Sequence, residues 1–273
     1  MYKATAAEVS KLRNATGAGM MDSKKALEEA AGDFDKAIEI LRKQGQQVAA
    51  KRADRDSVEG AVIAKVNDDM TKGVIISLNC ETDFVAKNDD FVALAQKLAD
   101  IALNSTNKEE FMNASIDGIT VSEKLIEQTG VIGEKIEIGT FQIIEGELVN
   151  AYIHAGNKIA AVAALSKKVD GAEEAAREVA MQVAAMNPIA LNENEVSEDI
   201  IAKEREIAKD QLIQEGKPEN MIDRIVEGKL QRYFKDNTLV HQAFIKDAKT
   251  SVADYVKTFD KDLEVVGYIR FGL

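Results

Sequence analysis

The residue types that could do chemistry in this sequence gather between Asn79 and Phe91, where an acidic residue, Asp83, directly precedes an aromatic one, Phe84. An apolar ring among polar neighbours could be held out for a contact with another molecule. The ring has an alternative use, because burying a phenylalanine in the protein's own core stabilises a fold by about 1.5–3 kcal/mol. Composition alone favours burial, so the pattern leaves both uses of Phe84 open.

The elements on either side of this stretch determine how its side chains are presented. The run Gly73–Leu78 is apolar and rich in β-branched residues, which predicts a buried strand, and apolar residues recur at helical spacing from Phe91 to Leu103. Asn88 to Asp90 are better N-caps for that helix than Asp83. The sequence therefore predicts a strand, a loop and a helix, with no structural task for Asp83.

Covalent catalysis has little support. The two histidines, His154 and His241, lie far apart, the chain has one cysteine, Cys80, and it contains no Gly-x-Ser-x-Gly elbow. These residues are too few for a Cys/His zinc site. The run Gly130–Lys135 lacks the spacing of a phosphate-binding loop, so we interpret it as a turn before a strand at Ile136–Ile138. We expect neither a conventional enzyme nor a bound metal, nucleotide or other cofactor.

The composition indicates a globular protein long enough for two compact units, since 45% of its 273 residues are hydrophobic. A net charge of −12 and a pI of about 4.9 disfavour nucleic acids and anionic membranes as partners, because both attract basic surfaces. A single cysteine excludes an intramolecular disulfide. No apolar run approaches the roughly 20 residues of a membrane span. We expect a soluble, cytoplasmic protein.

The N-terminal part, about 45 residues, predicts three short helices. Thr5 and Glu8 have the spacing of a capping box before the first helix, Asp22 is the expected cap of the second, and Gly45 is expected to end the third. The charged run Lys51–Asp56 then predicts a solvated linker.

Paired methionines, Met20 and Met21, lie beside two glycines in the turn between the first two predicted helices. Methionine is flexible and polarizable, so this pair could form an adaptable contact surface. The same side chains could instead fill the small core of the three helices. The sequence leaves the two alternatives open.

The rest of the chain contains an internal repeat, whose copies open at Glu59 and Glu145, 86 positions apart. Each copy predicts two strands, a loop and a helix, which indicates two related α+β subdomains with antiparallel sheets. The second copy joins its strand Ile159–Leu165 to its helix Ala172–Met186 through Ser166–Gly171, which contains no aromatic residue. The topology therefore does not require Phe84.

Two amphipathic runs, Val196–Gln214 and Met221–Phe234, flank Gly216 and Pro218 and predict an antiparallel helical hairpin that projects from the body. A final alternating run, Val265–Phe271, predicts a strand that closes the second sheet. His154 lies in the second copy's strand hairpin. From its position alone, its expected role is structural.

Three stretches resemble the elongation factor Ts family. The string NCETDFVAKN at Asn79–Asn88 resembles its signature, TGAGMMDSKKAL at Thr16–Leu27 resembles its N-terminal motif, and Gly216–Pro218 with Val226–Gly228 also matches. The chain carries Ser23 where the family commonly has cysteine, a nearly isosteric departure. The resemblance covers nearly the whole chain.

This resemblance implies a domain organisation. The expected parts are a ubiquitin-associated-like three-helix domain with its linker, the core N-subdomain, the core C-subdomain and a protruding helical hairpin used for dimerisation or contact. Their expected boundaries are 1–55 for the first, 56–140 for the second, 141–190 and 236–273 for the third, and 191–235 for the hairpin.

The resemblance also implies a function, guanine-nucleotide exchange on elongation factor Tu, with a homodimer or a 2:2 complex as the expected assembly and no small-molecule substrate of its own. In the family the central motif dislocates Mg²⁺ from the partner, and the matching residues here are Thr82, Asp83, Phe84 and Val85. The partner-binding residues implied besides Asp83 and Phe84 are Met20, Met21 and His154. The competing hypothesis is an adaptor that tethers two proteins without changing nucleotide exchange.

Overall fold

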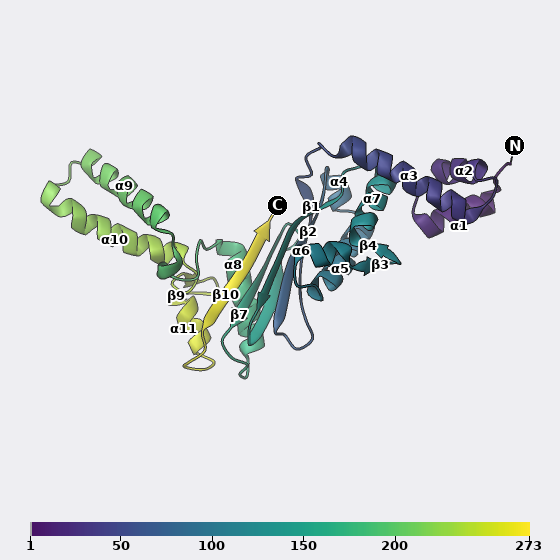
Figure 1. The fold of residues 1–273 in the computed structure, drawn as a ribbon. Helices are drawn as coiled ribbons and strands as arrows, with labels where there is room; N and C mark the ends of the chain where they lie inside the picture. Colours follow the sequence, from purple (N-terminus) through teal and green to yellow (C-terminus); the bar gives the residue numbers. More distant parts are fainter. Residues whose placement is uncertain (1) are drawn as a thin grey trace.

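The chain folds into an elongated molecule with two three-stranded antiparallel sheets in its middle (Figure 1). A computed structural model describes residues 2–273, so Met1, with which the expected first domain begins, lies outside the described residues. The helices are α1 (Ala6–Thr16), α2 (Met20–Glu29), α3 (Phe34–Arg52), α4 (Asp83–Ala86), α5 (Asp89–Leu103), α6 (Lys108–Asn113), α7 (Val121–Ile132), α8 (Ala172–Met186), η1 (Glu193–Glu195), α9 (Glu198–Gln214), α10 (Glu219–Asn237) and α11 (Val252–Lys257). The strands are β1 (Glu59–Val66), β2 (Lys72–Cys80), β3 (Ser115–Ile116), β4 (Ile119–Thr120), β5 (Glu137–Glu145), β6 (Leu148–Ile153), β7 (Ile159–Leu165), β8 (Ala243–Phe244), β9 (Asp247–Ser251) and β10 (Val265–Gly272).

The three predicted N-terminal helices are present, but some of their predicted ends are wrong. The capping box of Thr5 and Glu8 at the start of α1 is confirmed. The cap expected at Asp22 is wrong, because α2 begins at Met20 after Gly19 and Asp22 lies within its first turn. The helix end expected at Gly45 is also wrong, because α3 continues to Arg52 and takes up the start of the predicted linker.

A helix–helix crossing explains the glycine inside α3. Gly45 is buried where α3 packs against α7, opposite Gly130. A Cβ on Gly130 would lie 2.5 Å from the Cα of Gly45, so the two backbones approach more closely than side chains would permit. Gly45 therefore serves helix packing, and the local expectation of a helix end is overridden by this tertiary contact.

The residues Gly130 to Lys135 do not form the simple turn that was expected. α7 continues through Gly130 to Ile132, and Gly133, with a φ of 80°, ends the helix in the left-handed conformation that glycine favours. The strand expected at Ile136–Ile138 is longer, because β5 runs from Glu137 to Glu145. Glu145 therefore ends a strand of the first sheet, and β6 begins at Leu148.

The first sheet has the order β1-β2-β5 with antiparallel pairing throughout, and Glu59 at the start of β1 is opposite Cys80 at the end of β2. Successive side chains of a strand point to opposite faces. Ile63 and Ile76 accordingly pack against α5, whereas Val62 and Ile75 face the second sheet. These alternating contacts place α5 on one face of the sheet.

The second sheet repeats this plan. Its order is β10-β7-β6, and α8 covers its outer face through a core that includes Leu165, Val179 and Val183. The hairpin and helix of the second copy are thus confirmed, as is the closing strand at Val265. The inner faces of the two sheets pack on each other, and a Cβ on Gly73 would lie 2.7 Å from a methyl carbon of Val162. The layers follow in the order α5, first sheet, second sheet and α8, and this arrangement is an α+β fold.

The two copies meet in a reciprocal way. Lys158, in the turn between β6 and β7, donates hydrogen bonds to Glu59 and to the carbonyl oxygen of Gly60 at the end of the first sheet. Lys168, in the loop before α8, donates to the carbonyl oxygen of Asp69 in the turn between β1 and β2. The strand-to-helix loop of each copy therefore lies beside the hairpin turn of the other.

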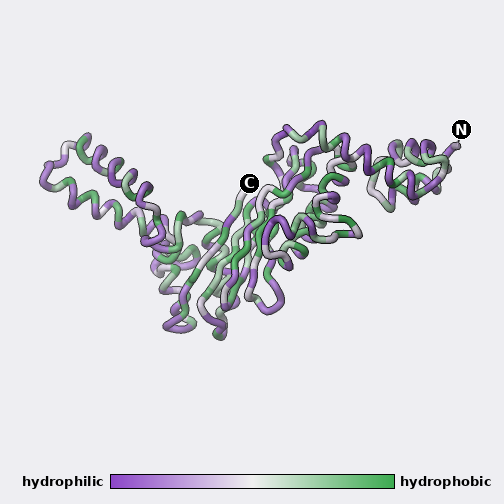
Figure 2. Tube along the Cα trace, viewed as in Figure 1, coloured by the Kyte–Doolittle hydropathy of each residue, from purple (hydrophilic) through white to green (hydrophobic). Residues whose placement is uncertain are grey.

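Helices α9 and α10 lie at the far end of the molecule from α1 and α2 (Figure 1). They pack on each other through an apolar stripe that includes Leu212, Ile222 and Val226. Hydrophilic and hydrophobic residues alternate along both helices, whereas hydrophobic residues dominate the central strands (Figure 2). Among residues 2–273, no helix combines the length and the apolar character needed to cross a bilayer.

Candidate functional site

The connection between β2 and α5 contains a single helical turn, α4, which presents Phe84 to solvent. Val85 is partly buried and packs against the core of the first sheet, and Ala86 is buried. Residues of a helix are about 100° apart, so a turn that directs Val85 and Ala86 inward directs Phe84 outward. The Phe84 side chain is 84% exposed, the highest value among the exposed large apolar residues that the structure describes. Burial of Phe84 in the protein's own core is thereby excluded.

Asp83 has a local contact that the sequence did not indicate. Its Oδ2 accepts a hydrogen bond from Nζ of Lys87 at 2.6 Å, one helical turn further on. This hydrogen bond, together with the positive charge of Lys87, lowers the pKa of the Asp83 carboxyl. An exposed pair of this kind is screened by solvent and contributes little to stability. The Asp83 carboxylate therefore stays ionised and accessible beside the Phe84 ring.

Two carboxylates fix the start of this loop, and we call Glu81 and Glu134 the carboxylate brace. Glu134 accepts hydrogen bonds from the backbone N–H groups of Glu81 at 3.1 Å and Thr82 at 3.0 Å, and from Oγ1 of Thr82 at 2.7 Å. Glu81 in turn accepts from the backbone N–H of Lys135 at 2.7 Å and from Nη1 of Arg52 at 2.7 Å. The Lys135 bond is the main cause of the lowered pKa of Glu81.

The brace was missed in the sequence, because Glu81 and Glu134 are 53 positions apart and acids are common in this chain. Arg52 had been assigned to a solvated linker. Instead it ends α3 and forms an ion pair with Glu81. The sequence signals that could have indicated the brace were the charge of Glu81, next to Thr82, and the charge of Glu134, directly after the glycine that ends α7.

Cys80 is the last residue of β2 and directly precedes Glu81 of the brace. Its side chain is buried and its Sγ donates to the carbonyl oxygen of Thr82 at 3.2 Å. Desolvation, together with the nearby Glu134 carboxylate, raises the pKa of the Cys80 thiol to about 11. The thiol is therefore protonated at neutral pH and is not a nucleophile.

We expect Cys80 in the native protein to react with iodoacetamide at pH 8 about two orders of magnitude more slowly than in the urea-unfolded chain, since the thiolate fraction falls by that factor. Mass spectrometry of timed samples measures the rate. Alkylation of the native protein at the rate of the unfolded chain would show that the end of β2 opens readily.

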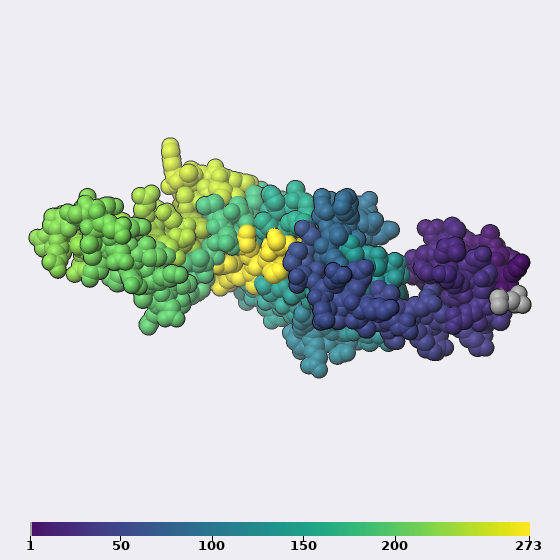
Figure 3. Space-filling view, turned by 90° about the horizontal axis from the view of Figure 1, so that it is seen from above, coloured from purple at the N-terminus to yellow at the C-terminus, as the bar shows by residue number. Residues whose placement is uncertain are grey.

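Met20 and Met21 lie at the start of α2 and are 62% and 59% exposed, so they do not fill the core of the N-terminal helices. That core consists of other side chains, including Leu12 and Leu27. α2 lies at the N-terminal end of the molecule, away from α4 (Figure 1), and the space-filling view of Figure 3 shows the purple N-terminal residues at one end of the molecule. The structure thus does not bring the methionines together with Phe84.

His154 follows β6 and is exposed, with its Nδ1 3.1 Å from Oη of Tyr152. The turn that begins at His154 also contains Lys158, which binds Glu59, and Glu59 is opposite Cys80 in the first sheet. His154 and the loop of Phe84 therefore lie at the same end of the two sheets, although they come from different copies of the repeat.

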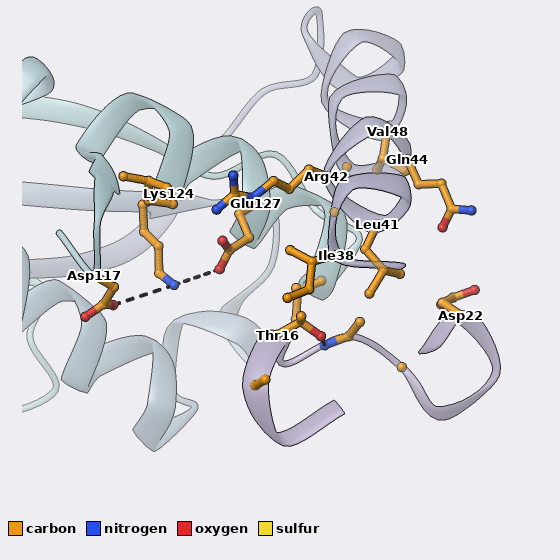
Figure 4. A pocket seen from close by; sticks show the side chains of 17 residues that line it. Thr16, Asp22, Ile38, Leu41, Arg42, Gln44, Val48, Asp117, Lys124 and Glu127 are labelled. Carbon is orange, nitrogen blue, oxygen red and sulfur yellow. Dashed lines mark hydrogen bonds and ion pairs between the residues drawn. The ribbon is translucent and has the colours of Figure 1, made fainter. Parts of the chain in front are cut away.

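A cavity of about 410 Å³ lies beside the contact of α3 with α7 and is lined by residues of the N-terminal helices and of α7 (Figure 4). Ile38, Leu41 and Val48 of α3 form part of its apolar wall. Near its other side Lys124 lies between two acids, 2.7 Å from Glu127 and 3.8 Å from Asp117. Its lining does not include α4, so the cavity is separate from the Phe84 loop.

The comparisons with known proteins agree on one family. The family model described as Elongation factor TS matches residues 81–273. The chain is 70% identical over 273 residues to "Elongation factor Ts" of Christiangramia forsetii and 63% identical over 273 residues to that of Flavobacterium psychrophilum, with both chains fully covered in each case. It is 46% identical over 272 residues to "Elongation factor Ts" of Porphyromonas gingivalis, which covers 98% of each chain.

Proposed function

Since the chain belongs to the elongation factor Ts family, we propose that it is the guanine-nucleotide exchange factor of elongation factor Tu. It binds the GDP-bound GTPase, dislocates the Mg²⁺ ion and promotes GDP release, so that GTP can rebind during translation elongation in the cytoplasm. The observation that carries this proposal is the Phe84 ring, held out into solvent on a turn whose start is fixed by the carboxylate brace.

Exchange requires differential binding and no covalent step. A protein that binds the nucleotide-free GTPase more tightly than the GDP-bound form lowers the affinity for GDP by the same factor in the joint complex. Mg²⁺ demands nearly ideal octahedral geometry, so a small displacement of its supports weakens its binding. The chain thus acts as an exchange factor without chemistry or a small-molecule substrate of its own.

In this mechanism Phe84 is the wedge that enters the GTPase domain of elongation factor Tu, and its neighbours hold it in place. Val85 anchors the turn in the core, Thr82 connects it to Glu134, and Asp83 supplies a negative charge beside the ring. An apolar ring that is solvated when free and buried on binding gains hydrophobic stabilisation only in the complex.

Further contacts to elongation factor Tu come from the N-terminal domain and from the second copy of the repeat. The first 55 residues form a ubiquitin-associated-like domain with its linker, and it binds the partner through Met20 and Met21, whose flexible exposed side chains suit an adaptable surface. His154 makes a contact at the same end of the sheets as Phe84. The core N-subdomain is 56–140, and the core C-subdomain is 141–190 with 236–273.

Residues 191–235, which contain α9 and all but the last two residues of α10, form a protruding helical hairpin that serves dimerisation or a second contact. Its two helices bury one apolar stripe against each other and leave Ile200, Ile207 and Met221 exposed. Exposed apolar residues at the far end of the molecule are consistent with a homodimer or a 2:2 complex with the partner.

The decisive experiment measures release of fluorescently labelled GDP from purified elongation factor Tu by stopped flow, with and without the protein. We expect release to accelerate with protein concentration up to a maximal rate. A pull-down that captures elongation factor Tu without any acceleration of GDP release would refute exchange and leave an adaptor.

Asp83→Ala is expected to slow the stimulated release about tenfold, because a charge beside the wedge is lost at a desolvated contact. The matched control is Lys87→Ala, which breaks the same ion pair but keeps the acid. We expect the control to retain nearly full stimulation. Equal losses in the two variants would mean that Asp83 acts only through Lys87 and does not meet the partner.

A further inference from the structure

The turn that carries Phe84 is too short to hold its own orientation. α4 has four residues, and a single isolated helical turn is unstable because its nucleation is unfavourable. Thr82 occupies the N-cap position but its side chain does not cap this helix, since its hydroxyl donates to Glu134 instead. The direction of the Phe84 ring therefore depends on anchors outside the turn.

Two anchors are available. On the core side, Val85 and Ala86 pack against the first sheet, which fixes the turn's distance from the body. On the other side, Glu134 accepts three hydrogen bonds from Glu81 and Thr82, the two residues that precede the turn. The apolar contacts determine which side of the turn faces inward but are not directional, whereas three directed hydrogen bonds to a carboxylate also fix the backbone from which the turn starts.

We propose that Glu134 is a positioning residue for exchange: its carboxylate holds the turn of Phe84 in the orientation in which the ring enters the partner. This inference rests on the proposed function. Glu134 does not touch the partner in this role, and it acts through Thr82 and Phe84.

The reciprocal half of the brace gives Glu134 a fixed base. Glu81 accepts a hydrogen bond from the backbone N–H of Lys135, the residue directly after Glu134. The two segments that contain Glu81 and Glu134 therefore hold each other in place. Glu81 also binds Arg52, the last residue of α3, at 2.7 and 2.9 Å. α3 is the last of the three N-terminal helices, so these helices and the Phe84 turn share this anchor.

The first test compares Glu134→Ala with Glu134→Gln in the stopped-flow GDP-release assay. Glutamine can accept both backbone N–H groups with its carbonyl oxygen and donate its amide to Oγ1 of Thr82, so it keeps the geometry and loses the charge. We expect Glu134→Ala to lower the maximal stimulated rate about tenfold, as the loss of well-formed hydrogen bonds implies, and Glu134→Gln to restore most of it. The concentration for half-maximal stimulation should change much less.

A double variant shows whether Glu134 acts through the ring. If it does, Glu134→Ala combined with Phe84→Ala is no slower than Phe84→Ala alone. Losses that add fully would overturn the proposal, as would full stimulation by Glu134→Ala. If Glu134→Ala does not fold, Thr82→Val takes its place, because it removes a single hydrogen bond to Glu134. A normal maximal rate in Thr82→Val together with a lowered maximal rate in Glu134→Gln would overturn the proposal equally.

Hydrogen exchange of the free protein separates this proposal from the proposed function. The amides of Ala86, Lys87 and Asn88 are bonded within the turn, and Glu134→Ala should deprotect them while the amides of β2 stay protected. Glu147→Ala, an exposed acid in the turn between β5 and β6, is the matched control and should change nothing. Unchanged protection in Glu134→Ala would overturn the positioning role even if wild-type protein stimulates exchange. If wild-type protein does not stimulate exchange, the proposed function fails first.

Discussion

Replacing Phe84 with alanine is expected to slow the stimulated release of GDP from elongation factor Tu by about 30-fold or more. An aromatic ring that anchors a protein interface commonly contributes about 2 kcal/mol or more, and 1.4 kcal/mol corresponds to a factor of ten. The free protein should not lose stability, because the ring is 84% exposed and exposed substitutions usually change the free energy of unfolding by less than about 0.5 kcal/mol. Stopped flow and thermal unfolding measure the two quantities.

The control is Val266→Ala, which removes a large apolar side chain, 49% exposed, from β10. It should leave the stimulated rate unchanged. Phe84→Leu keeps part of the apolar contact and should fall between wild type and Phe84→Ala. Equal rates for Phe84→Ala and wild type would remove the ring from the mechanism, and a clear loss of stability would show that the ring is packed on its own core in solution.

The sequence predicted those parts of the site that local patterns determine. The apolar run before Cys80 gave a strand and Asn88 capped the following helix as expected, because strand composition and N-cap chemistry are local signals. The repeat was also predictable, since both copies share one order of strands and helix.

The orientation of Phe84 could not be predicted from its neighbours. Whether the ring turns inward depends on one helical turn, and that turn is fixed by Glu134, which is 52 positions from Thr82. Long-range hydrogen bonds of this kind leave no periodic pattern in a sequence. Composition alone favoured burial of the ring, whereas the family resemblance implied an exposed ring, and the ring is exposed because Val85 and Ala86 take the inward positions.

Gly45 shows the opposite error, in which a local signal predicted too much. A glycine near the end of an amphipathic run is a frequent helix terminator, yet here it lies within α3 because α7 crosses at that point. The crossing partner, Gly130, lies 85 positions further on, and the sequence had assigned it to a turn. Both errors have one cause, a close approach of two helices that neither helix encodes alone.

This crossing predicts that Gly130→Ala lowers the free energy of unfolding by about 1–3 kcal/mol, the usual cost of overpacking. Alanine is the better helix former by about 0.5–1 kcal/mol, so propensity alone would stabilise α7. The added Cβ, however, would lie 2.5 Å from the Cα of Gly45, and a backbone atom cannot move aside as a flexible side chain can. α3 must shift away from α7, and the steric cost exceeds the gain in propensity.

Gly45→Ala is the matched control, because the same methyl group is added from the other helix. Its Cβ would lie 3.5 Å from the carbonyl oxygen of Ile126 and 3.8 Å from the Cα of Gly130, which are ordinary contacts. Helix propensity then dominates, and the variant should be as stable as wild type or more stable by up to about 1 kcal/mol. Urea unfolding followed by circular dichroism compares the two. Equal changes of stability would mean that the helices do not cross as closely as these glycines permit.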